Sequence, residues 1–202
     1  MKKALGIAAI ALIALAGCSE SANRAPDRSP EDSPAAAANP ESTAAAAPSC
    51  GAAGATLTAD GIGRLRVGAR VSEVREACRV VSDETNPGSE GMAERRIAVT
   101  IGDAPVDAVV VDDRIWRVHV ETGDFRTADG LGVGTTVADL RDKGNARVLA
   151  GEGSMFMTLA SHCGLSFRLG GVPFGPERSA AELPAGGRVV EVLAMGCESP
   201  RP

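Results

Sequence analysis

The sequence predicts an α+β domain built from two tandem repeats, each a helix followed by antiparallel strands, with the helices packed on one face of the sheet. Three observations predict this fold. A short pattern occurs twice, each copy leads into a short amphipathic helix pattern, and alternating apolar and polar residues follow each helix. The domain is expected at residues 50–202, with repeat one at about 57–122 and repeat two at about 126–197.

The chain begins with the features of an export signal. Lys2 and Lys3 precede an uncharged, apolar run at residues 4–16, which is shorter than the roughly 20 residues needed to span a bilayer. The run ends in Leu-Ala-Gly-Cys at residues 15–18, and this ending resembles the signal of bacterial lipoproteins. The resemblance implies that residues 1–17 are a signal peptide that is removed, and that Cys18 carries the lipid.

The same resemblance implies a location. Cys18 is followed by Ser19 and not by Asp, which in enterobacterial-type sorting favours the periplasmic face of the outer membrane. Acylated Cys18 is then the contact with membrane lipid, and two or three acyl chains hold a protein stably where one chain binds only marginally. The alternatives are an uncleaved membrane anchor and a buried cysteine.

Residues 18–49 are expected to be the lipidated cysteine and a disordered tether. The segment after Cys18 is rich in Ala, Pro, Ser, Glu and Asp and has no bulky apolar residue. Such a segment cannot bury enough surface to offset the entropy of ordering it, and its spaced prolines oppose helix formation in the alanine runs. It predicts a spacer between the membrane and the domain.

The two copies of the repeated pattern share Thr-Ala-Asp-Gly, at residues 58–61 and 127–130, and each continues into a helix. In the second copy Thr136 and Asp139 have the spacing of a capping box, and Val137 and Leu140 share a helical face. Val71, Val74 and Cys78 form the matching face in the first copy.

Strands are expected after each helix. In the first copy they cover residues 97–101, 105–111 and 116–120, with a turn at Asp112 and Asp113. Trp116, Val118 and Val120 are expected to face the core, and Arg117 and His119 to face solvent. In the second copy the strands are expected at about 146–150, 154–160, 164–169 and 188–196, and the polar residues 82–94 predict a loop.

The residues that begin the helices carry a second resemblance. Gly68, Arg70 and Val74, and again Gly134, Thr136 and Leu140, have the spacing of the helix-starting motif in small outer-membrane assembly lipoproteins of the SmpA/OmlA type. The tandem pattern also resembles β-lactamase-inhibitor-like proteins. In the first copy, Arg70 stands where the SmpA/OmlA-type proteins usually have Thr or Ser. Both families act by protein–protein contact, so the resemblance implies an interaction module.

Four cysteines remain once Cys18 is set aside, and an even number in an exported domain predicts disulfides. If residues 164–169 and 189–196 pair so that Leu165 faces Met195, Cys163 meets Cys197 at the strand ends. Cys50 then bonds to Cys78. The alternatives are four free thiols or a metal site. A metal site is disfavoured because the sequence has no Cys-x-x-Cys and one adjoining histidine, His162.

Composition limits the function further. The net charge of -5 disfavours nucleic-acid binding, and one Trp, four Phe and no Tyr leave few stacking platforms. Ser154 and Ser166 lack the Gly-x-Ser-x-Gly context of a nucleophile elbow, and His119 and His162 have no evident catalytic partner. No catalytic residue, cofactor or metal is expected.

The loop at residues 170–187 is long for a hairpin connection and carries Phe174 between prolines and glycines. Phe174 is either a partner-binding anchor or part of the core. The sequence therefore predicts a membrane-anchored periplasmic lipoprotein that acts as a non-catalytic interaction module for another envelope protein. An envelope hydrolase and a small-ligand-binding lipoprotein are the alternatives.

Overall fold

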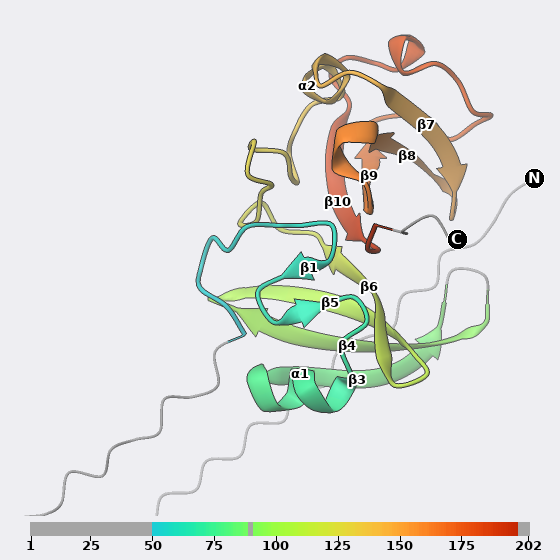
Figure 1. Ribbon diagram of the computed structural model, residues 1–202. Helices are drawn as coiled ribbons and strands as arrows, with labels where there is room; N and C mark the ends of the chain where they lie inside the picture. Colours follow the sequence, from blue (N-terminus) through green and yellow to red (C-terminus); the bar gives the residue numbers. More distant parts are fainter. Residues whose placement is uncertain (1–49, 89–90, 198–202) are drawn as a thin grey trace, which may run out of the picture. The chain divides into compact units, whose positions relative to one another are not determined.

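The computed structural model describes residues 50–88 and 91–197 (Figure 1). The expected signal peptide, Cys18 and the tether, at residues 1–49, lie outside the described residues. Within the described ranges no helix has the length and apolar character needed to cross a membrane.

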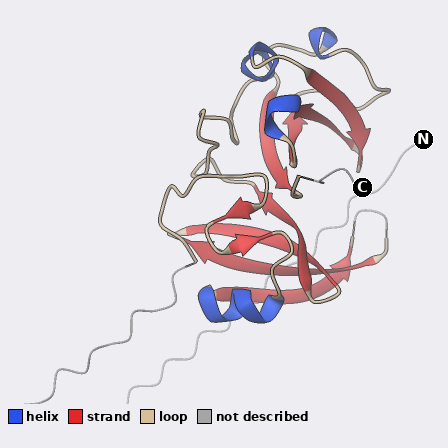
Figure 2. Cartoon of the chain, viewed as in Figure 1, coloured by secondary structure: helices blue, strands red, loops and turns tan. Residues whose placement is uncertain are grey.

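The described chain is mostly β-structure, as Figure 2 shows, so the prediction of an α+β fold with two tandem helix-plus-strand repeats is wrong. A small sheet pairs β1 with β2, and the remaining strands form one antiparallel sheet in the order β3-β4-β5-β6-β10-β9-β8-β7. The elements are β1 (Gly61–Ile62), β2 (Leu65–Arg66), α1 (Val71–Ala77), β3 (Val80–Pro87), β4 (Ala93–Ile101), β5 (Ala104–Val111), β6 (Arg114–Val120), α2 (Val137–Asp142), β7 (Ala146–Gly151), β8 (Ser154–Leu159), η1 (Ala160–His162), β9 (Leu165–Gly170), η2 (Ala180–Glu182) and β10 (Arg188–Ala194).

Two features explain the error. The helices are short, with seven residues in α1 and six in α2, so they contribute little to the architecture. The polar residues 82–94, expected as a loop, instead lie largely in β3 and the start of β4. A strand at the edge of a sheet can be polar, because one of its sides faces water.

Both helices begin as the sequence predicts. Asp139 donates its backbone N–H to Thr136 Oγ1 at 3.1 Å and its carboxylate accepts from the Thr136 N–H at 3.3 Å, which is the predicted capping box. At α1 the Arg70 N–H donates to Glu73 Oε2 at 2.9 Å. Val74 and Leu140 are buried.

The turn before each helix is attached to a central strand in the same way. Gly68 donates its N–H to the carbonyl of Ile115 in β6, and Gly134 donates to the carbonyl of Val189 in β10, each at 2.8 Å. Both glycines have positive φ, of 84° and 90°, which favours a residue without Cβ. The similar sequence stretches thus share a turn, although the strands that follow belong to one sheet.

One face of the eight-stranded sheet carries the main core. Alternate residues of the central strands point to this face, and Val74 and Leu140 of the two helices join the same cluster. The largest buried side chains in the cluster include Phe125 and Phe167. Val109, Phe156 and Leu193 are also buried but lie outside this cluster. Since their sequence neighbours face the core, they must lie on the opposite face of the sheet.

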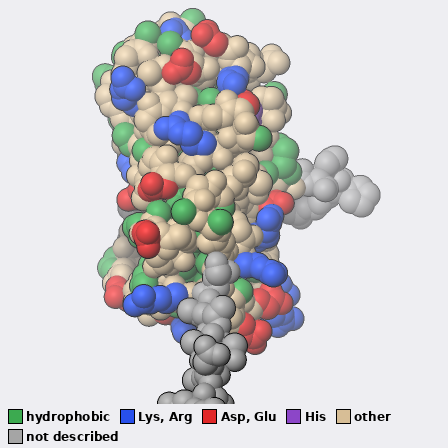
Figure 3. Space-filling view, turned by 90° about the vertical axis from the view of Figure 1, so that its left-hand side faces the viewer, with side chains coloured by type: hydrophobic (Ala, Val, Ile, Leu, Met, Phe, Trp, Pro, Cys, Tyr) green, Lys and Arg blue, Asp and Glu red, His purple; other side chains and the backbone are tan. Residues whose placement is uncertain are grey.

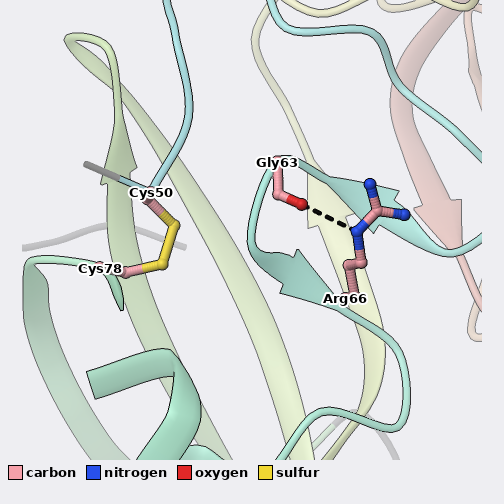
Figure 4. Close-up of a disulfide and its surroundings, with 4 residues drawn as sticks. All are labelled: Cys50, Gly63, Arg66 and Cys78. Carbon is pink, nitrogen blue, oxygen red and sulfur yellow. Dashed lines mark hydrogen bonds between the residues drawn. A yellow bond between two sulfur atoms is a disulfide. The ribbon is translucent and has the colours of Figure 1, made fainter. Parts of the chain in front are cut away.

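The disulfide between Cys50 and Cys78 is confirmed (Figure 4). It joins the first described residue to the C-cap of α1, and both cysteines are buried. The Cys50 carbonyl accepts a hydrogen bond from the Arg64 N–H at 2.7 Å. A Cβ on Gly63 would lie 2.3 Å from that carbonyl, so glycine is required there. Arg66 closes the same turn by donating Nε–H to the Gly63 carbonyl at 2.9 Å.

The disulfide between Cys163 and Cys197 is also confirmed, although the register used to predict it was wrong by one residue. β9 and β10 pair as expected, but Leu165 lies opposite Ala194 and not opposite Met195. Met195 lies just beyond the end of β10, and its N–H donates to the Gly164 carbonyl at 2.8 Å. The two cysteines therefore meet beyond the strand ends.

We expect each disulfide to stabilise the domain appreciably. The bonds close loops with sequence separations of 28 and 34 residues. The chain-entropy model then gives roughly 3.5 kcal/mol for each. Replacing Cys50 and Cys78 together by Ala should lower the free energy of unfolding by about this amount, measured by urea denaturation. Four titratable thiols in the native exported protein would contradict the disulfides.

Candidate functional site

A bulge in β6 changes the predicted orientation of one side chain, Trp116. Val109 of β5 pairs with Arg117, and Val110 pairs with Ile115, so Trp116 is an extra residue. Trp116 was expected in the core, but it is 51% exposed. Arg117 and His119 were expected to face solvent, but both are buried. The inserted residue moves Trp116 off the core side, while Val118 and Val120 lie in the core as predicted. Arg117 and His119 lie on the opposite side, as predicted, but that side is also covered.

Arg117 and His119 belong to a buried hydrogen-bonded network. Arg117 donates Nε–H to His119 Nε2 at 2.8 Å, and His119 Nδ1 lies 2.6 Å from Glu191 Oε1. A guanidinium only donates, so His119 Nε2 must accept. These partners therefore select the tautomer whose Nδ1–H donates to Glu191. His119 is 5% exposed, so this arrangement lies within the protein.

Glu191 of β10 accepts hydrogen bonds from two neighbouring strands, through His119 of β6 and Arg168 of β9. Its second oxygen accepts from Arg168 Nε of β9 at 2.5 Å. Burial alone would raise the pKa of Glu191, but the hydrogen bonds from His119 and Arg168 and the positive charge of Arg168 outweigh burial and hold that pKa below its ordinary value. Glu191 is therefore an ionised carboxylate at neutral pH, and it faces β6 across the middle of the sheet.

Arg117 also has partners at the other end of the network. It donates Nη1–H to Glu152 Oε1 at 2.8 Å, and Nη2 lies 3.5 Å from Glu94 Oε2. Glu94 in turn accepts from Arg96 Nε at 2.6 Å. Glu152 lies in the turn between β7 and β8 with φ of 46°, in the left-handed region that few non-glycine residues adopt. That backbone conformation presents its carboxylate to β6.

The network connects parts of the chain that are distant in sequence. Its side chains come from β4, β6, β9, β10 and the β7–β8 turn, and they adjoin the face that buries Val109, Phe156 and Leu193. No buried side-chain nitrogen or oxygen in the described ranges lacks a hydrogen-bond partner. A fully paired network of this kind holds elements in fixed positions, so we interpret it as a rigid support.

A cleft of about 340 Å³ lies beside this support. Its lining includes Met92, Glu94, Val111, Trp116, Arg117 and Glu152. Met92, Val111 and Trp116 are exposed, although all three are large and apolar. The Arg117 guanidinium lies 5.0 Å from the centre of the Trp116 ring, within the range of a cation–π contact. We call this the Trp116 cleft. Its rim is the exposed apolar set Met92, Val111 and Trp116, and its floor is the charged set Glu94, Glu152 and buried Arg117.

The sequence did not predict the Trp116 cleft. Its residues come from β4, β5, β6 and a turn some 35 residues away from β6, and the bulge that exposes Trp116 leaves no signal in the residue pattern. Trp116 itself is the one tryptophan of the chain. The one signal in the sequence that could have indicated a binding surface is this single tryptophan followed by Arg117.

His162 takes part in a different cluster. Its Nδ1 lies 2.9 Å from Ser161 Oγ, and its Nε2 lies 2.9 Å from Asp129 Oδ1. Lys143, Thr127 and His162, in that order of effect, hold the pKa of Asp129 well below its usual range by hydrogen bonding to the carboxylate.

This row of Ser161, His162 and Asp129 resembles a catalytic triad only in its residue types. Ser161 and His162 are sequence neighbours, and Asp129 already accepts from Thr127 Oγ1 at 2.6 Å and from Lys143 Nζ at 2.7 Å. Neither Ser161 nor His162 lines the Trp116 cleft. The cluster therefore ties η1 to the loop that precedes α2.

Phe174 lies on the surface. It is 60% exposed, so of the two predicted roles the structure excludes a place in the core. The loop around it is held by internal hydrogen bonds: Arg178 donates to the Pro173 carbonyl at 3.3 Å, and the Ser179 N–H donates to Glu182 at 2.7 Å. Phe174 is not part of the Trp116 cleft lining.

Comparisons with known proteins add little. No family model matches the chain, and no curated protein matches it. Among solved structures, the chain is similar to the uncharacterized protein YfeY from Escherichia coli, with 21% sequence identity and a TM-score of 0.49 over 73% of this chain and 97% of that one. Within the described residues no group of three or more His, Cys, Asp or Glu side chains could hold a metal ion.

The buried network predicts a pH-dependent contribution to stability. Glu191→Gln should lower the free energy of unfolding at pH 7 by about 2–3 kcal/mol, because Arg168 and His119 lose a charged partner. The folded pKa of Glu191 lies below the ordinary 4.5, so the contribution is complete above about pH 4.5 and is lost as the pH falls through the folded pKa.

Urea denaturation across this pH range measures the effect. Exposed Glu121 provides a matched control, and Glu121→Gln should change the free energy of unfolding by less than about 0.5 kcal/mol. Equal effects of the two substitutions at pH 7 would contradict the structural role of Glu191.

Proposed function

We propose that the chain is a lipid-anchored protein of the cell envelope whose domain binds another envelope protein through the Trp116 cleft. The observation that carries this proposal is the exposed set Met92, Val111 and Trp116 beside buried Arg117. Tryptophan, methionine and arginine are enriched where proteins bind one another, and anchors of this kind contribute most of the binding free energy.

The rigidity of the cleft floor supports the proposal. Arg117 is fixed by His119, Glu152 and Glu94, so the floor is already arranged before a partner arrives. A preorganised surface loses little conformational entropy on binding. An apolar side chain of the partner would displace water from Met92, Val111 and Trp116 without disturbing the charges beneath them.

The proposed location depends on the sequence signal and fits the cysteines. Structural disulfides persist in oxidising compartments, and this domain has two. On the face that Figure 3 shows, Lys and Arg side chains are interspersed with Asp and Glu, so that face has no polybasic patch for anionic lipid. Lipid on Cys18, and not the domain surface, is the proposed membrane contact.

The contacts of the two histidines support the proposal of a non-catalytic role. His119 is buried between Arg117 and Glu191, and each of its ring nitrogens has a protein partner. His162 is likewise bonded at both nitrogens. Neither histidine has a nitrogen available for a substrate proton, so we propose binding and not hydrolysis.

Lipid attachment can be tested directly. In intact bacteria fed a clickable palmitate analogue, the wild-type chain should be labelled and should sediment with membranes. Cys18→Ala should abolish both labelling and sedimentation, because the acceptor thiol is lost. Separating inner from outer membranes on a sucrose gradient then tests the location. Undiminished labelling of Cys18→Ala would contradict the anchor.

Partner binding can be tested by crosslinking from the cleft. A photoreactive amino acid at Val111 should form one dominant adduct in intact cells, and Trp116→Ala should reduce its yield by about tenfold. Val81, 53% exposed on β3, is a matched apolar control outside the cleft lining and should not give this adduct. The same adduct from Val81, or none from Val111, would contradict the proposal.

A further inference from the structure

The two edges of the eight-stranded sheet differ in how well they are protected. β3 and β7 are the edge strands (Figure 1). An edge strand presents unpaired backbone N–H and C=O groups, and natural proteins shield such edges with charges, prolines, bulges or covering segments. A poorly shielded edge is a place where another strand can pair.

β3 has several of these protective features. A bulge interrupts its pairing with β4 between Val80 and Ser82, and the strand ends at Pro87. Asp83 is bonded to Arg95 Nε at 2.9 Å and also accepts from Arg75 of α1. The Arg95 hydrogen bond, helped by Arg75, lowers the pKa of Asp83 to about 2, so this edge keeps its charge.

β7 lacks the bulge and the proline that protect β3. It pairs with β8 in unbroken register from Ala146 to Gly151, it contains no proline, and Arg147 is its one charged residue. Leu149 is 40% exposed. Within the described residues, no backbone hydrogen bond reaches the outer side of this strand. The edge therefore presents a regular row of unpaired donors and acceptors.

A groove of about 470 Å³ runs along this edge. One wall is residues 146–148 of β7, and the other is residues 177–180 of the long loop. Successive strand residues point to opposite faces, so a groove that touches three in a row lies at the edge and not on a face. No backbone hydrogen bond in the described ranges joins this loop to β7, so the strand's partner position is not taken.

We propose that this groove binds an extended segment of a partner polypeptide, which pairs with β7 as an additional strand. An extended backbone is the occupant whose alternating N–H and C=O groups match those of an open edge. The loop wall at residues 177–180 lies beside residues 146–148 of the edge, which favours a single extended segment over a second folded copy. Leu149 of β7 is exposed and offers an apolar contact to a side chain of the bound segment.

This surface is separate from the Trp116 cleft and does not depend on the function proposed for it. The linings of the two sites share no residue. The β7 groove would recognise the backbone of a peptide, so it is predicted to bind many peptide sequences with alternating apolar residues. The cleft recognises side chains. Trp116→Ala should therefore leave binding in the β7 groove unchanged.

The probe is a phage-displayed library of random peptides of about twelve residues, selected on the mature lipidated protein in detergent. Enriched peptides should alternate β-branched or aromatic residues. Bound peptide should slow hydrogen exchange of alternate β7 amides by about tenfold or more, with no such change in β3. Absence of enriched peptides, or protection outside β7, would overturn the proposal.

A matched pair of substitutions tests the groove itself. Ala180 lines the groove, so Ala180→Trp should fill it and weaken the selected peptide by about tenfold or more. Ala181 is exposed beside it but outside the lining, and Ala181→Trp should retain the affinity. Equal affinities for the two variants, or a concentration-dependent dimer that protects β7 without peptide, would show that a partner strand is not the occupant.

Discussion

The chain of hydrogen bonds from Arg117 through His119 to Glu191 is the constraint on which the rest of this structure depends. β6 and β10 join the two halves of the sheet and pair only from Val118–Ala194 to Val120–Val192. The network spans that junction with charged groups removed from water, each of which is costly to leave unpaired. It thereby fixes the junction, the β7–β8 turn that holds Glu152, and the floor of the Trp116 cleft.

Sequence reasoning succeeded where a physical rule acts locally. Alternation located β5 and most of β4, the capping box located the start of α2, and cysteine parity with strand pairing gave both disulfides. It failed where one residue breaks the period. The extra residue Trp116 in β6 and the irregularity between Val189 and Glu191 in β10 each shift the alternation. The burial of Arg117 and Glu191 left no signal in the alternation, because it depends on partners that are distant in sequence.

The fold class could not be obtained for a related reason. A polar stretch such as residues 82–94 carries too little apolar periodicity to be told from a loop, and its place at the sheet edge comes from pairing with β4. Short helices after a repeated turn suggested helix-plus-sheet units, but the pairing of β6 with β10 makes one sheet. The Trp116 cleft could not be predicted for both reasons, since it needs the start of β4, the β6 bulge and the turn between β7 and β8.

The disulfide at the start of the domain has a mechanical consequence. With Cys18 held by a membrane, as proposed, any pull along the chain enters the domain at Cys50. The bond passes that load directly to Cys78, shortly before β3, so the segment between the two cysteines, which contains β1, β2 and α1, is bypassed. The disulfide therefore lets the domain bear tension from its anchor without unfolding of the segment that contains β1.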